Sequence, residues 1–138
     1  MRQAKVAVEG VSRNGGNTNR LVTESVGTYA EKNGCFYVRY EETEASGMAG
    51  TTTVIKWSLS QVSLIRHGAY DMHQEFAEGN RYAFEYRTPY LSIPMETVTD
   101  QVRIRKLGYG WRIRLEYELV CPAAERNRMT TNILVDLR

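Results

Sequence analysis

Two charged residues stand at positions where chemistry could occur inside a folded chain. Arg66 follows Val62 and Leu64 at a spacing of two residues, and Glu42 follows Tyr40 at the same spacing. Residues two apart on a strand share a face, so both charges are predicted on an otherwise apolar face. A buried charge needs a partner, and an arginine fork binds a carboxylate through two hydrogen bonds. The spacing predicts that Arg66 and Glu42 lie at one mouth of an apolar interior, paired with each other or with a ligand carboxylate. The alternative is that both side chains reach water at strand ends.

Aromatic residues are predicted on the same inner face. Tyrosine and tryptophan join a large apolar ring to a polar group, and a lining of this kind suits an amphipathic ligand. The alternative is that these rings only fill the core. The predicted ligand-binding residues are Glu42, Arg66, Tyr40, Trp57, Tyr82, Phe84, Tyr86, Trp111 and Tyr117.

An arginine-rich hairpin is the second candidate site. A turn over Leu107–Gly110 would pair Lys106 with Trp111 and would set Ile104 opposite Ile113. The same register sets two pairs of arginines face to face on the outer side, where like charges repel. RNA phosphates or an acidic protein surface would relieve that repulsion, although a solvated charged face is the alternative. The predicted anion-binding patch is Arg103, Arg105, Lys106, Arg112 and Arg114.

Metal and catalytic sites are not predicted. The spacing of His67, Asp71 and His73 fits no zinc signature, and Cys35 and Cys121 lie far apart without a CxxC pair. The chain has no nucleophile elbow, no P-loop and no glycine-rich dinucleotide motif. We therefore expect a protein that is not an enzyme, with no catalytic residue, no metal and no cofactor.

The elements that must position these residues are strands. From Trp111 to Leu119 apolar and charged residues alternate without a break, which is typical of a half-buried antiparallel strand. Similar patterns predict about ten strands at 5–9, 22–31, 35–42, 51–57, 61–67, 70–78, 81–87, 95–106, 111–119 and 129–137. Loops are expected at 12–19 and 122–128, and Asn33-Gly34 favours a tight type I′ turn. Because hairpin turns join neighbours nearly throughout, we predict one all-β domain over residues 1–138, a single antiparallel up-and-down β-barrel.

Composition narrows the class of protein further. The chain has 138 residues, 42% of them hydrophobic and 25% charged, as in ordinary soluble domains. The net charge of +2 is too small to demand a nucleic-acid partner. No apolar run could span a bilayer, and the first residues lack a signal-peptide core, so a cytoplasmic protein without a membrane partner is expected.

Several short motifs occur in an order that resembles a known family. They are Glu41-Glu42, Gly47–Thr53, Leu64–Gly68, Phe76–Gly79 and Thr88-Pro89-Tyr90. In order and spacing they are similar to the YwiB-like family, domain of unknown function 1934, from about the first strand to the last. The resemblance implies a bacterial cytoplasmic protein with a calycin-like β-barrel, the architecture of lipocalins and fatty-acid-binding proteins. It implies no established activity.

The function that these patterns favour is non-enzymatic. The first hypothesis is a carrier or sensor that holds a small, mostly apolar ligand inside the barrel, with Arg66 at its polar end. The alternative is an interaction module whose arginine-rich hairpin binds RNA or an acidic protein. The sequence leaves the oligomeric state open.

Overall fold

The computed structural model describes residues 1–121 and 126–138. Its regular elements are ten strands and one 3-10 turn. They are β1 (Arg2–Asn14), β2 (Asn17–Lys32), β3 (Cys35–Glu41), η1 (Glu44–Ser46), β4 (Thr51–Trp57), β5 (Val62–Gly68), β6 (Met72–Phe76), β7 (Arg81–Arg87), β8 (Ser92–Leu107), β9 (Gly110–Val120) and β10 (Arg126–Asp136).

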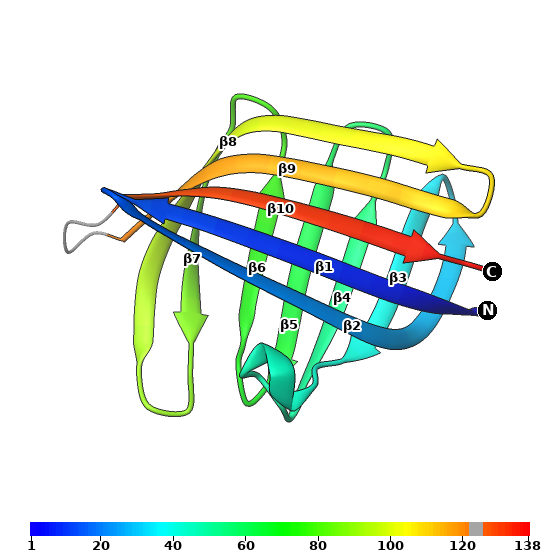
Figure 1. Cartoon of the computed structure of the whole chain (residues 1–138), viewed down its shortest axis with the longest axis horizontal. Helices are drawn as coiled ribbons and strands as arrows, with labels where there is room; N and C mark the ends of the chain where they lie inside the picture. Colours follow the sequence, from blue (N-terminus) through cyan, green and yellow to red (C-terminus); the bar gives the residue numbers. More distant parts are fainter. Residues whose placement is uncertain (122–125) are drawn as a thin grey trace.

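The strands form one antiparallel meander that curls into a nearly closed barrel (Figure 1). The order is β6-β5-β4-β3-β2-β1-β10-β9-β8-β7, so strands that follow one another in sequence are neighbours in space. The exceptions are β1, which pairs with β10, and the seam between β6 and β7. Within the described chain a single bridge crosses this seam, between Asp71, just before β6, and Arg87 of β7. The predicted all-β, up-and-down barrel is confirmed.

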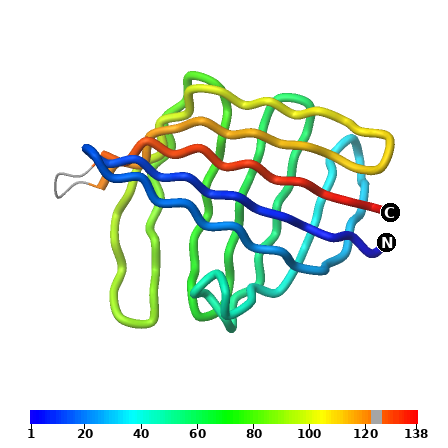
Figure 2. Tube along the Cα trace, in the orientation of Figure 1, coloured from blue at the N-terminus to red at the C-terminus, as the bar shows by residue number. Residues whose placement is uncertain are grey.

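The two long strands β2 and β8 change their pairing partners along their length. Residues 17–26 of β2 pair with β1 alone, whereas from Gly27 onward β2 also pairs with β3. A side chain at Gly27 would place its Cβ 2.1 Å from the Arg39 carbonyl oxygen, so only glycine allows this approach. The strand β8 pairs with β7 from Ser92 to Val98 and with β9 from Glu96 to Leu107. As Figure 2 shows, β1, β2 and β8–β10 thereby cross over β3–β6.

The core lies between these two layers. At one end, Trp57, Trp111, Phe36 and Tyr29 form an aromatic cluster, in which the Phe36 and Trp111 ring centroids are 4.4 Å apart. The Trp111 indole N–H donates to the Tyr29 hydroxyl over 3.1 Å, so the cluster satisfies this buried polar group. Aliphatic residues of β1, β9 and β10 continue the core beside it.

The structure corrects two predicted loops. The loop expected at 12–19 is wrong, because β1 and β2 stay paired up to Asn14 and Asn17 and only Gly15-Gly16 turn between them. Polar residues mark an exposed hairpin end here rather than a loop. The connection expected at 122–128 is wrong at its end, where residues 126–128 pair with β9 as the start of β10. The rest of it, residues 122–125, lies outside the described residues.

Other local predictions hold. Asn33 and Gly34 have φ angles of 53° and 76°, as the type I′ turn requires. In the part of the chain that the structure covers, no helix has the length and apolar character needed to cross a membrane.

Candidate functional site

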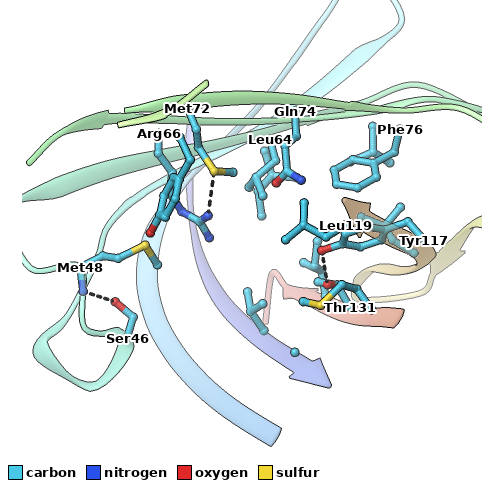
Figure 3. Close-up of a pocket in the computed structure, with 18 of the residues that line it drawn as sticks. Ser46, Met48, Leu64, Arg66, Met72, Gln74, Phe76, Tyr117, Leu119 and Thr131 are labelled. Carbon is cyan, nitrogen blue, oxygen red and sulfur yellow. Dashed lines mark hydrogen bonds between the residues drawn. The ribbon is translucent and has the colours of Figure 1, made fainter. Parts of the chain in front are cut away.

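A cavity of about 310 Å³ lies inside the barrel, and Figure 3 shows side chains that line it. Its lining comes from both layers: Val8 and Ile133 stand on one side, and Leu64 and Phe76 on the other. Leu21, which also lines it, is 51% exposed, so the cavity opens to solvent beside the first half of β2. An interior that is mostly apolar, open at one side and supplied with a few polar groups has the form of a small-molecule site.

Arg66 and Glu42 meet at this cavity. The Arg66 Nε lies 3.7 Å from Glu42 Oε2, and the two side chains are 17% and 3% exposed. Antiparallel pairing of β4 with β5 brings Arg66 opposite Thr53, whose hydroxyl donates to the same carboxylate oxygen. Glu42 is therefore held by both a hydroxyl and a guanidinium, which offsets part of the cost of burying its charge.

The Arg66 guanidinium has N–H donors that could bond to a ligand. Its Nε is buried and has no hydrogen-bond partner among the described residues. Its Nη1 donates to the Met72 sulfur over 3.5 Å, and a thioether is only a weak acceptor. Figure 3 shows the guanidinium pointing into the cavity, toward the side of Met48. An oxygen-bearing ligand end would be a better acceptor than the sulfur.

Three of the tyrosines that line the cavity have raised pKa values. Burial raises the pKa of the Tyr40 hydroxyl well above its usual range, and the nearby Glu42 carboxylate adds to the effect. Burial also raises the pKa of Tyr86 and of Tyr117. All three therefore stay protonated at neutral pH and can act as hydrogen-bond donors.

Methionines form a large part of the lining. Of the five methionines in the chain, four line the cavity: Met48, Met72, Met95 and Met129. Methionine is unbranched and polarisable, so it adapts to apolar groups of different shape. The wall is therefore suited to a flexible hydrocarbon portion.

The predicted ligand-binding residues separate into two groups. Six of the nine line the cavity: Glu42, Arg66, Tyr40, Phe84, Tyr86 and Tyr117. Trp57 and Trp111 instead pack in the aromatic cluster. Tyr82 lies against His73 at the seam, with the two rings tilted and their centroids 5.9 Å apart. These three lie outside the cavity lining.

Sequence reasoning did not find other lining residues. On β6 the lining residues Met72, Gln74 and Phe76 occupy every second position, and this alternation indicates a shared inner face. On β10 the same spacing relates Met129 and Thr131. Leu21 and Met48 gave no such signal. Leu21 lies in the stretch that follows the predicted loop, and Met48 lies beyond η1 in an irregular connection.

The histidines lie away from the cavity and near carboxylates. His67 Nδ1 is 2.9 Å from Asp71 Oδ1, while His73 contacts Glu75. Among the described residues, no group of three or more His, Cys, Asp or Glu side chains could hold a metal ion. Cys35 and Cys121 are both free thiols and half-buried.

The arginine-rich hairpin has the predicted register. Ile104 pairs with Ile113, and the arginines face each other as Arg105 with Arg112 and Arg103 with Arg114. Arg114 contacts Glu116 and Asn132, at 3.5 Å and 3.3 Å. In residues 1–121 and 126–138, Arg103, Arg105 and Arg112 make no ion pair, and all five residues of the predicted patch are exposed.

Comparison with known proteins agrees with this architecture. The crystal structure of the ywiB protein from Bacillus subtilis has a similar fold, with a TM-score of 0.81 and 22% identity over 96% of this chain and 91% of that chain. No curated protein matches the chain. The model of the family described as Domain of unknown function (DUF1934) matches residues 6–132. Since that match spans nearly the whole barrel, the chain belongs to the DUF1934 family.

Proposed function

We propose that the barrel binds a small amphipathic carboxylate, with its hydrocarbon portion among the methionines and its carboxylate on Arg66, and that it does so without catalysis. The observation that carries this proposal is the Arg66 guanidinium at an apolar cavity, whose buried Nε has no hydrogen-bond partner in the described part of the chain. Burying a donor without an acceptor costs free energy, which a ligand oxygen would recover. A carboxylate suits the planar guanidinium fork better than a neutral group does.

The size of the cavity limits the ligand. At 310 Å³ the cavity lies at the lower end of the roughly 300–1,000 Å³ typical of small-molecule pockets, so a short ligand is favoured. Octanoate, with eight carbons and two oxygens, is of this size. Long-chain fatty acids exceed it unless their tails leave through the mouth beside Leu21.

Calorimetric titration with octanoate and with 1-octanol tests both parts of the proposal. We expect octanoate to bind at least about tenfold more tightly than the alcohol, because a charged hydrogen bond contributes more than a neutral one. Arg66→Met should remove this preference and leave the weak binding of the alcohol. Arg39→Met, at an exposed position on β3, is the matched control.

Two results would reject the proposal at different levels. Equal affinity for acid and alcohol would reject the carboxylate while keeping an apolar ligand. No binding of either compound, together with native mass spectra of the protein from its own host that show no retained small molecule, would reject the ligand site.

A second candidate function rests on the arginine-rich hairpin. Arg103, Arg105 and Arg112 stand together on the outer face without ion-pair partners among the described residues, and like charges in register repel. We propose RNA as the polyanion that this face would bind. Single-stranded RNA binding that weakens steeply with salt, and that Arg103→Ala with Arg112→Ala abolishes, would support it. Binding that the double substitution leaves unchanged would reject it.

A further inference from the structure

The first half of β2 has a free edge. Residues 17–26 pair with β1 on one side and, within the described residues, with no strand on the other. Among residues 1–121 and 126–138, no backbone hydrogen bond from a turn or loop reaches this edge either. A row of unpaired N–H and C=O groups of this length is a template for another strand.

The two turns that flank β2 show which residues face the edge. Asn14 and Asn17 close the two-residue turn Gly15-Gly16, and residues that close such a turn bond to each other. Odd-numbered residues of β2 therefore bond to β1. The turn closed by Lys32 and Cys35 leads to the same assignment: even-numbered residues of β2 bond to β3, and odd-numbered residues therefore bond to β1. Before Gly27, the even-numbered residues thus direct their backbone groups outward from the sheet: Thr18, Arg20, Val22, Glu24 and Val26.

This edge carries two charged side chains, Arg20 and Glu24, but it lacks the other common protections against strand pairing. It contains no proline, no bulge and no lysine, which are common ways of blocking an edge. Its outer side chains include Val22 and Val26, which are 50% and 58% exposed. Apolar side chains flanking free backbone groups favour a partner strand over water.

We propose that this edge pairs with the same edge of a second copy of the chain, antiparallel and about a two-fold axis at Val22. In this register Val22 lies opposite Val22 of the second copy, and Arg20 lies opposite Glu24 of the second copy. Even-numbered residues meet even-numbered residues, so the free backbone groups match. The strand is thus complementary to itself in charge and in hydrogen bonding, as a two-fold interface requires.

The ion pairs of the single chain do not prevent this arrangement. Arg20 contacts Glu9 on β1, with 2.6 Å between Nη2 and Oε2, but its guanidinium has five donors and is 65% exposed. It can therefore donate hydrogen bonds to a second carboxylate from across the interface. Pairing over Arg20–Glu24 gives a segment of typical strand length.

A dimer of this kind would lie beside the cavity mouth. Leu21 and Thr23, between the pairing residues, point to the opposite face and line the cavity. The dimer does not depend on the proposed ligand, because the pairing uses the backbone and the outer side chains only.

Sedimentation velocity over a series of protein concentrations tests the dimer. We expect the unmodified chain to dimerise reversibly. Glu24→Arg and Arg20→Glu should each raise the dissociation constant about tenfold, because one substitution turns two symmetry-related attractions into repulsions. The combined variant, Arg20→Glu with Glu24→Arg, should restore dimerisation, and Arg39→Glu on the fully paired strand β3 should have no effect.

Val22→Pro gives an independent test. Proline removes the N–H that faces the free edge, so it should abolish the dimer, while circular dichroism should show that the barrel still folds. An unmodified chain that stays monomeric at its highest soluble concentration would overturn the proposal. So would a dimer that withstands both single charge reversals, whether or not the proline variant folds.

Discussion

The Arg66–Glu42 pair is the most consequential contact at the scale of residues. Both side chains are largely removed from water, so each depends on the other and on Thr53 for compensation of its charge. Removing one member of a buried pair leaves an uncompensated charge, which costs more than removing both.

Arg66→Met is therefore expected to destabilise the ligand-free protein by about 3 kcal/mol. Combining it with Glu42→Gln should recover most of that loss, since no buried charge then remains without a partner. Urea unfolding of the two variants and the unmodified protein measures both effects. A single variant as stable as the double variant would show that the loss does not come from an uncompensated charge on Glu42.

Buried tyrosines predict a loss of stability in alkali. The pKa of Tyr40 is raised by burial above the value of 10.0 that an unfolded chain has. Below that pH both states keep the proton and stability does not change. Above it the unfolded chain releases protons that the folded chain retains, so the free energy of unfolding falls as pH rises. Urea unfolding across this range should show the fall, and Tyr40→Phe should reduce it. Tyrosinate absorbance of the folded protein that rises in one step near pH 10 would contradict it.

At the scale of elements, β2 is decisive because it belongs to both layers of the barrel. Gly27 marks the position where it gains its second partner, and the adjoining β3 carbonyl leaves no room for a side chain there. The change of partner separates the free edge, with the cavity mouth beside it, from the closed end of the barrel.

Gly27→Ala is expected to destabilise the barrel by about 1–3 kcal/mol, because the added methyl group forces the backbones of β2 and β3 apart. Gly10→Ala is the matched control on β1, where an added Cβ meets nothing within 4 Å. Thermal unfolding compares the two. Equal melting temperatures would show that β3 can move aside at no cost.

The sequence predicts these elements well where the information is local. Alternation from Trp111 to Leu119 fixes the faces of β9, and a tight turn fixes its register with β8. The register shift between Thr99 and Gln101 leaves no local signal. The sequence pattern does not predict the cavity mouth either. Leu21 and Met48 come to line the cavity only because β2 crosses over strands that are distant in the sequence.

At the scale of the whole molecule, the barrel is a single sheet with one seam. Asp71 and Tyr70, just before β6, contact β7 through the Asp71–Arg87 bridge and the stacking of Tyr70 on Tyr86. In the interior, the Gln74 amide of β6 donates to Thr97 of β8 over 3.0 Å, beyond the seam. The strands β1, β9 and β10 instead have neighbours on both sides. Local stability should therefore fall from β10 toward the seam.

Amide hydrogen exchange measured by NMR is expected to be slowest in β1, β9 and β10 and faster at the facing edges of β6 and β7. Gln74→Leu should speed exchange in β6 with little effect in β10, because it removes a contact that spans the seam. Uniform protection of all ten strands would contradict a weak seam.

The pairing of β1 with β10 has a consequence during protein synthesis. The ribosome delivers β1 first and β10 last, so one whole edge of β1 stays without its partner while the intervening residues are made. The β1–β2 hairpin can form early, but the barrel wall cannot be completed until the last strand emerges. A nascent chain that stalls before Arg126 would expose that edge, and chaperones that shield unpaired strands would be needed most at this stage.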